Sequence, residues 1–278
     1  MASPVVGLIA GNGRFPFLAA AGARRAGRRV VAVAIREEAA PELEREVDEL
    51  HWVGVGQLGR AIEILHGAGV REAVMAGQVK HRQIFSDVVP DLKLMGVLAR
   101  LVLKNTDSLI GGVADALARE GITLLPSTAF LEEQLAHEGA MTRRAPGREE
   151  REDIAYGETV ARTLAGMDLG QTAVVKDRAA VALEAMEGTD EVIRRAGRIA
   201  GAGTVVVKVS KPGQDLRFDV PVVGMGTIEA MREAGARVLA MDAGRTLMLD
   251  KADLLLRAEE AGIAIWGLRP RDEGGRGV

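Results

Sequence analysis

The chain contains no cysteine among its 278 residues, and this absence removes several classes of protein at once. Without thiols there is no disulfide framework, thiolate zinc site, iron–sulfur cluster or cysteine nucleophile. An excess of basic charge is also missing, because 36 Lys and Arg stand against 39 Asp and Glu, for a formal net charge of −3. Nucleic-acid binders normally carry a basic excess, so this balance argues against a nucleic-acid partner.

Long hydrophobic runs and two common catalytic signatures are absent as well. Charged residues interrupt every apolar stretch before it reaches the ~18 to 20 residues that span a bilayer, and the amino terminus lacks the features of a signal peptide. The four histidines show no HExxH motif, and no GxSxG nucleophile elbow occurs. These absences predict a soluble cytoplasmic protein without a histidine zinc site.

One recurring pattern predicts the fold class. A helical segment ends in Gly and a short β-branched run follows at once, within residues 26–35, 67–77, 120–127, 233–244 and 260–268. Glycine ends a helix because it adopts the left-handed conformation readily. The apolar runs are continuous, as in strands that are covered on both faces. The pattern therefore predicts an α/β protein with a doubly wound, Rossmann-like parallel sheet.

A charged stretch with Pro146 and Gly147 interrupts the apolar periodicity and predicts a domain boundary. We expect an N-terminal nucleotide-binding domain over 1–136, a linker over 137–148 and a C-terminal α/β catalytic domain with a mixed sheet over 149–278. The strands expected in the second half lie at 172–176, 204–210, 218–223, 237–241, 246–249 and 263–267.

A glycine-rich turn follows the first predicted strand, in the sequence VVGLIAGNGRFP from Val5 to Pro16. Backbone N–H groups of such a turn point at an anion, and the following helix favours negative charge there. The match to a dinucleotide fingerprint is poor, because Pro16 replaces the third glycine and residues 35–38 offer no clear ribose-binding acid. The turn predicts either a phosphate cradle or a tight turn without a ligand.

Two further loops follow predicted strands or precede predicted helices. In the loop MAGQVKHR, Gly77 permits close backbone approach, Gln78 offers paired amide groups, and Lys80 can meet phosphate. The alternative for this loop is a solvated basic surface. Thr106 lies at an expected helix start, where capping alone explains it, although a helix N-terminus there could also bind phosphate.

The segment from Val206 to Thr227 carries the densest set of polar residues, with two lysines, two aspartates, Gln214 and Arg217. We expect Asp219 to lie inside an apolar strand, because RFDVPVV alternates two faces. Carboxylates with basic neighbours suit Mg²⁺-assisted phosphate chemistry. The alternative is a salt-bridged hairpin. Lys176 at a strand end and Thr189 at a helix start are expected to join this group.

Four of these segments together resemble the LpxI family: GLIAGNGRFP, MAGQVK, EGTDE and KVSKPGQDLRFDVPVVGMGTIEAM. These are bacterial UDP-2,3-diacylglucosamine pyrophosphatases of lipid A synthesis, and the resemblance covers essentially the whole chain. It implies an enzyme that splits UDP-2,3-diacylglucosamine into UMP and 2,3-diacylglucosamine 1-phosphate (lipid X), with water attacking the β-phosphorus. It also implies Mg²⁺ (or Mn²⁺) as cofactor, a homodimer, and transient contact with the inner-membrane surface.

The resemblance assigns roles to matching positions, and the strand-end and helix-start candidates Thr106, Lys176 and Thr189 are added to them. The predicted substrate-binding residues are Gly11, Asn12, Gly13, Gly77, Gln78, Lys80, Thr106, Lys176, Thr189 and Gln214. The predicted catalytic residues are Asp219, Lys208 and Lys211, and the predicted metal ligands are Asp219 and Asp215.

Two other functions stay open at the level of sequence. A nucleotide-dependent oxidoreductase is suggested by the glycine turn, and its failure to bind NAD(P) would dismiss it. A non-catalytic carrier of a nucleotide sugar or lipid needs a pocket but no metal. Binding without product formation would favour the carrier.

Overall fold

The computed structural model describes residues 4–36, 38–79, 89–100 and 106–269, which form two compact units. The N-terminal unit comprises the chain up to Leu131 together with Asp215–Asp219, and the C-terminal unit comprises Glu132–Gln214 and the chain from Val220. The division expected from the sequence (1–136, 137–148 and 149–278) stays a prediction. The sequence pattern gave no sign that a short segment near residue 217 groups with the first unit.

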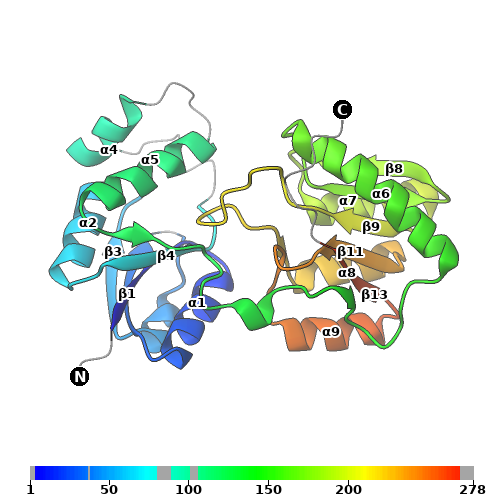
Figure 1. The fold of residues 1–278 in the computed structure, drawn as a ribbon, viewed down its shortest axis with the longest axis horizontal. Coiled ribbons are helices and arrows are strands. Elements are labelled where there is room, and N and C mark those ends of the chain that lie inside the picture. The colour runs from blue at the N-terminus through cyan, green and yellow to red at the C-terminus, as the bar shows by residue number, and fades with distance from the viewer. Residues whose placement is uncertain (1–3, 37, 80–88, 101–105, 270–278) are drawn as a thin grey trace. The chain divides into compact units, whose positions relative to one another are not determined.

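The N-terminal unit is built on a parallel five-stranded sheet in the order β3-β2-β1-β4-β5 (Figure 1). Helix α1 packs against β1, β2 and β4, whereas α2 and α5 bury their apolar side chains with Val31 and Val33 of β2 in one cluster. Helices therefore cover both faces, which confirms the predicted doubly wound α/β sheet. The strands are β1 (Val5–Ala10), β2 (Arg29–Ile35), β3 (Glu49–Val53), β4 (Glu72–Ala76) and β5 (Thr123–Leu124). The helices are α1 (Phe15–Arg25), α2 (Leu58–Gly67), α4 (Leu92–Leu98) and α5 (Thr106–Arg119), with a 3-10 helix at Pro41–Glu46.

The C-terminal unit has a mixed six-stranded sheet in the order β6-β13-β11-β9-β7-β8 (Figure 1). Strands β9, β11 and β13 are parallel to one another, and β7, β8 and β6 pair antiparallel with their neighbours. This confirms the predicted mixed sheet. Its strands are β6 (Gly139–Ala140), β7 (Thr172–Lys176), β8 (Ala179–Leu183), β9 (Val205–Lys208), β11 (Val238–Asp242) and β13 (Ala264–Leu268). A separate parallel pair joins β10 (Val222–Val223) to β12 (Leu247–Met248), and 3-10 residues 132–134 precede β6.

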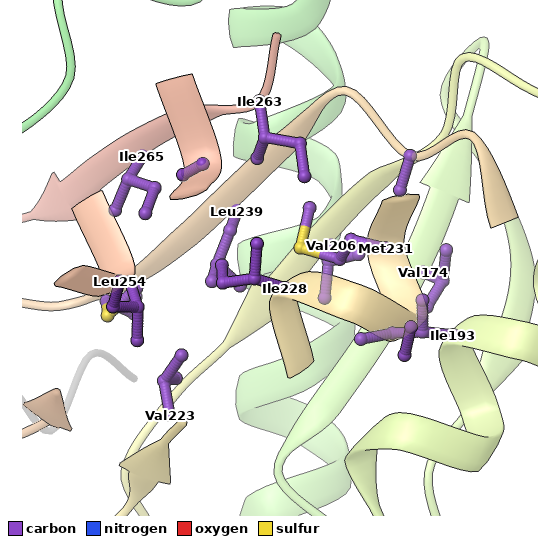
Figure 2. Packing of buried hydrophobic residues seen from close by; sticks show 14 of the residues in the cluster. Val174, Ile193, Val206, Val223, Ile228, Met231, Leu239, Leu254, Ile263 and Ile265 are labelled. Atoms are coloured by element: carbon purple, nitrogen blue, oxygen red, sulfur yellow. The ribbon is translucent and has the colours of Figure 1, made fainter. Parts of the chain in front are cut away.

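Alternate residues of these strands fill two cores, one on each face of the mixed sheet. Val174, Val206 and Leu239 pack under α7 (Thr189–Ala200), α8 (Met225–Ala234) and α9 (Lys251–Glu260), as Figure 2 shows. Val205 and Val207 point to the other face, against α6 (Arg148–Gly166). Because side chains alternate along a strand, even-numbered residues at the end of β9, including Lys208, belong to the α7–α9 face.

The glycine pattern that predicted the fold is confirmed in detail. Gly27, Gly69, Gly121, Gly235 and Gly262 have φ between 68° and 76°, and each precedes a strand of one of the two main sheets. A residue with a Cβ is strained in this left-handed conformation. These glycines therefore end their helices and turn the chain into the next strand.

One strand prediction was wrong, and it concerns the main candidate residue. Strand β10 covers only Val222–Val223, whereas residues 216–218 form a turn. The carbonyl oxygen of Asp215 accepts hydrogen bonds from the amides of Phe218 (3.2 Å) and Asp219 (2.9 Å). Hydrogen bonds within the turn thus replace hydrogen bonds to a neighbouring strand. Pro221 has no N–H group that could donate a hydrogen bond to such a strand. Asp219 follows a turn and is not part of an apolar strand.

The contact between α7 and α8 should depend on Gly197. A Cβ built there lies 2.7 Å from Cβ and 2.8 Å from Cα of Ala234, so Gly197→Ala is expected to destabilise the protein by about 1–3 kcal/mol through overpacking. Gly166→Ala in α6 is the control, since a Cβ there meets nothing within 4 Å and should stabilise by ~0.5–1 kcal/mol. Urea unfolding midpoints of both variants measure this difference; equal shifts would contradict the close contact.

Candidate functional site

The predicted site residues fall in both units. Those in the N-terminal unit are Gly11, Asn12, Gly13, Gly77, Gln78, Thr106, Asp215 and Asp219, and those in the C-terminal unit are Lys176, Thr189, Lys208, Lys211 and Gln214. Lys80 lies outside the described residues. Helix α5 begins at Thr106, whose side chain also lies outside them.

Backbone contacts bring together the glycine turn after β1 and the loop after β4. The amide of Gly11 donates to the carbonyl of Ala76 (2.9 Å), and that of Asn12 donates to the carbonyl of Gln78 (2.8 Å). A Cβ on Gly11 would lie 2.5 Å from the carbonyl oxygen of Gln78, and one on Gly77 would overlap the carbonyl oxygen of Asn12. Both glycines are therefore required by the packing of one turn on the other, which accounts for them without a ligand.

The end of the glycine turn has the backbone features of an anion-binding turn. Gly13 is exposed with φ 87°, and a Cβ built on it meets nothing within 4 Å. Helix α1 begins two residues later at Phe15, and its N-cap residue makes no side-chain capping hydrogen bond. Amide groups and the helix dipole at such a terminus attract phosphate. Asn12 and the exposed Gln78 supply amide side chains beside this position.

Sequence reasoning missed a carboxylate next to this turn. The side chain of Glu38, three residues beyond the end of β2, is 7% exposed, and its Oε2 accepts a hydrogen bond from Asn12 Nδ2 (2.9 Å). From the sequence, no clear ribose-binding acid was expected in residues 35–38, and Glu38 was assigned no role. Its only signal in the sequence is an acid shortly after the second strand.

Asp219 belongs to a short turn, residues 215–219, that is fastened to Ser127. The amide of Ser127 donates to the carbonyl of Leu216 (2.8 Å), and its Oγ donates to the carbonyl of Arg217 (2.7 Å). Ser127 is buried and follows β5 in the chain. These two hydrogen bonds place the turn beyond the carboxyl end of β5, the edge at which ligands bind in open α/β sheets.

Asp215 is held by Arg217 within this turn. Arg217 Nη2 lies 2.6 Å from Asp215 Oδ2, and Nε lies 2.9 Å from Oδ1. These hydrogen bonds hold the pKa of the Asp215 carboxyl below its usual value. Both carboxylate oxygens face the guanidinium of Arg217, and the metal-ligand role of Asp215 stays a prediction. Among the residues that the structure describes, no group of three or more acidic or His side chains is gathered to hold a metal ion.

In the C-terminal unit, Lys208 and Thr189 are brought together in a buried polar chain. Lys208 Nζ donates to Thr189 Oγ1 (2.8 Å), and Thr189 Oγ1 donates to Glu184 Oε1 (2.8 Å). Thr172 Oγ1 lies 3.3 Å from the same hydroxyl. Lys208 and Glu184 are 7% and 8% exposed. The ammonium group at the carboxyl end of β9 is thus fixed by the first residue of α7.

The turn after β9 holds Lys211 and Gln214. Lys211 Nζ pairs with Asp168 (2.6 Å), and the Lys211 amide donates to Gln214 Oε1 (2.8 Å). Gln214 Nε2 and Ser210 Oγ are buried without a hydrogen-bond partner among the described residues. Buried polar atoms are normally satisfied, so these two side chains are candidates to bind a ligand or a water molecule. Ser210 was not among the residues predicted from the sequence.

The ion pair between Asp242 and Arg162 contacts the start of this turn. Asp242, 2% exposed at the end of β11, accepts from the amide of Ser210 (2.7 Å) and from Arg162 of α6 (2.6 and 3.1 Å). Burial opposes the charge on Arg162, but hydrogen bonds to Asp242 and Glu158 outweigh it and raise the pKa of the guanidinium. The pair fixes where the chain leaves the sheet.

Lys176 does not join this group. Lys176 is the last residue of β7, whereas Thr172, the first residue of β7, pairs with Lys208 of β9. Lys176 and Lys208 therefore lie at opposite edges of the sheet. Lys176 Nζ donates to the carbonyls of Ala200 (2.9 Å) and Ala202 (2.8 Å) and so caps the end of α7. This contact gives Lys176 a structural role.

Each unit therefore gathers polar groups at the carboxyl edge of its parallel strands, which is the edge at which α/β proteins of this class bind their ligands. Comparison with known proteins identifies the family to which the chain belongs. The model of the LpxI N-terminal domain matches residues 5–134, and that of the LpxI C-terminal domain matches residues 137–266. The chain belongs to the LpxI family, which confirms the resemblance seen in its motifs.

A curated relative from Caulobacter vibrioides, named UDP-2,3-diacylglucosamine pyrophosphatase LpxI, is 32% identical over 278 residues. The match covers 96% of this chain and 98% of the relative. A solved structure titled "Crystal structure of gox2253" matches with a TM-score of 0.33 and 11% identity, over 95% of this chain and 77% of that chain. A likeness of that degree supports no conclusion about function.

The contact between Asp215 and Arg217 should appear in the acid limb of the stability profile. A carboxyl whose pKa is lowered by folding stabilises the protein fully above its ordinary pKa of ~4, and this contribution is lost as pH falls through the lower folded-state value. Asp215→Asn should therefore flatten the fall of unfolding free energy below about pH 4. Urea unfolding between pH 6 and 2.5 measures it, with Asp253→Asn on the exposed face of α9 as control. A slope unchanged from the parent protein would contradict the assignment.

Proposed function

We propose that this protein hydrolyses the pyrophosphate of UDP-2,3-diacylglucosamine to UMP and 2,3-diacylglucosamine 1-phosphate (lipid X), in lipid A synthesis. The observation that carries the proposal is the near-full-length match to a relative whose name states this activity, at 32% identity. Matches to both LpxI domain models support it. Family membership also argues against the oxidoreductase that the glycine turn left open.

The reaction is a displacement by water at the β-phosphorus. A bond forms from the water oxygen to this phosphorus, and the bond from the phosphorus to the bridging oxygen breaks. UMP leaves with the bonding electron pair, and the proton of water is released to solvent. The developing negative charge needs positive groups that are already in place when the reaction begins.

Asp219 is the proposed catalytic carboxylate. Its turn is fixed by Ser127, and its amide is held by the carbonyl of Asp215. Mg²⁺, with Mn²⁺ as alternative, would be held by Asp219 and substrate oxygens, since Mg²⁺ takes one or two carboxylates and keeps several waters. When bound, the ion supplies Lewis-acid polarisation of the phosphoryl group. The proposal leaves Asp215 as the partner of Arg217.

Lys208 and Lys211 are proposed to offset charge on the transferring phosphoryl group. The ammonium of Lys208 is held by Thr189 and, through it, by Glu184, so it keeps its position without the entropy cost of an exposed lysine. Lys211 sits in the turn that also presents the buried Nε2 of Gln214. This amide is a donor suited to a phosphate oxygen.

The UMP half of the substrate is assigned to the N-terminal unit. Gly13 and the start of α1 would face the phosphate, and Asn12 and Gln78 would donate to the nucleotide. Holding the leaving group in one orientation supplies part of the acceleration by positioning.

We also propose that the protein works as a homodimer and contacts the inner-membrane surface transiently from the cytoplasm. A substrate with two acyl chains partitions into lipid, which supports such contact. Within the described part of the chain, no helix is long and apolar enough to cross a membrane.

Hydrolysis in ¹⁸O-labelled water tests the proposal. Purified protein is incubated with UDP-2,3-diacylglucosamine and Mg²⁺, and both products are followed by mass spectrometry. Label in lipid X, abolished by EDTA and restored by Mg²⁺, is expected. Label in UMP would overturn the attack at the β-phosphorus, activity in EDTA would overturn the metal requirement, and binding without products would favour the carrier.

Loss of Asp219 should affect turnover more than binding. Asp219→Ala is expected to lower kcat by ~10²-fold or more while KM changes by less than about threefold, because the carboxylate acts on the reacting groups. Steady-state kinetics measure this, and Asp253→Ala is the control for removal of an aspartate elsewhere. Full activity of Asp219→Ala would refute the role.

A further inference from the structure

We propose that Glu38 binds the ribose hydroxyls of the nucleotide and makes the enzyme selective for ribonucleotide substrates. This inference rests on the proposed function, because it deepens the assignment of the UMP half to the N-terminal unit. It starts from the buried carboxylate that the sequence analysis overlooked.

The topology of the sheet places Glu38 where a ribose would lie. Strands β1 and β2 are parallel neighbours, with Ala10 opposite Ala34, so the glycine turn and the segment with Glu38 leave the sheet at the same edge. Neighbouring strands lie ~4.8 Å apart. The ribose of a nucleotide is bonded directly to its phosphate. If the phosphate faces the start of α1, the ribose therefore lies near the same edge of the sheet, where the segment after β2 begins. In doubly wound sheets the acid that binds a ribose hydroxyl occupies this position after the second strand.

The contacts of Glu38 fix the carboxylate toward the glycine turn. Its Oε2 accepts from Asn12 Nδ2 at 2.9 Å, and the amides of Glu38 (3.2 Å) and Ala39 (2.9 Å) donate to the carbonyl of Ile35. The turn after β2 thus holds the backbone, and Asn12 holds the side chain. Asn12, a residue of the predicted nucleotide site, is thus hydrogen-bonded directly to Glu38, which follows the adjacent strand β2.

The chemistry of a buried carboxylate favours a hydroxyl ligand. At 7% exposure the carboxylate is held by hydrogen-bond donors, Asn12 Nδ2 among them, since burial without donors is costly. A carboxylate accepts at about four lone-pair positions, and a ribose presents two adjacent O–H donors. A 2′-deoxy sugar offers one donor fewer, and a second phosphate at the 2′ position would be repelled. The site therefore selects a ribose with a free diol.

Binding of UMP and 2′-deoxy-UMP by isothermal titration calorimetry tests the inference. The parent protein should bind UMP about tenfold or more tightly than 2′-deoxy-UMP, because a hydrogen bond to a charged group is lost. The Glu38→Gln variant keeps an oxygen acceptor for Asn12 but removes the charge. In this variant the ratio of the dissociation constants for 2′-deoxy-UMP and UMP should fall to about threefold or less. The control Glu72→Gln removes a carboxylate at the first residue of β4, the opposite edge of the sheet, and should leave the ratio unchanged.

Two results would overturn the role of Glu38. Equal affinity of the parent protein for the two nucleotides would do so without any variant, which covers the case in which Glu38→Gln folds poorly. Equal weakening of both nucleotides in Glu38→Gln would show that Glu38 acts only by orienting Asn12.

The same preparations are assayed for hydrolysis of UDP-2,3-diacylglucosamine, which separates this inference from the proposed function. Hydrolysis together with an unchanged UMP ratio in Glu38→Gln retains the function and rejects the ribose contact. A ratio that depends on Glu38 without hydrolysis retains the contact and rejects the function.

Discussion

Two hydrogen bonds from Ser127 determine how the candidate site is built. The amide and hydroxyl of this buried residue donate to successive carbonyls of the turn that carries Asp219, so a segment from the second half of the sequence is part of the first unit. Each carbonyl would otherwise lose a partner, and unpaired buried backbone groups are costly. The position of the proposed catalytic carboxylate, and with it the chemistry available to the N-terminal unit, follows from this anchor.

The fold could be predicted from the sequence because its signals are local. Glycines such as Gly27 and Gly235 end a helix through their own backbone conformation, and the continuous apolar runs that follow them are strands covered on both faces. The loops near Gly11 and Gly77 were likewise correctly placed at strand ends. Each glycine is required by the close approach of the other loop, which agrees with the close backbone approach expected at Gly77, and their roles in substrate binding stay predictions.

The rest of the site depends on contacts between residues far apart in the sequence, which no local pattern reports. Asp219 was expected in a strand, because alternation in RFDVPVV is a strand signal, but the carbonyl of Asp215 and the bonds from Ser127 favour a turn. Glu38 and Ser210 were not singled out because no local pattern reports that their side chains are buried. Lys176 has the right chemistry for phosphate, but it lies at the other end of its strand.

The anchor of Ser127 also has a consequence for synthesis on the ribosome. Its hydroxyl partner lies 90 residues further along the chain, so the sheet of the N-terminal unit can emerge and pair before residues 215–219 exist. At about 5–20 residues per second, this gap lasts on the order of 5 to 20 s. During that time the polar edge beyond β5 is solvated by water, and the unit is completed only when most of the second unit has been made.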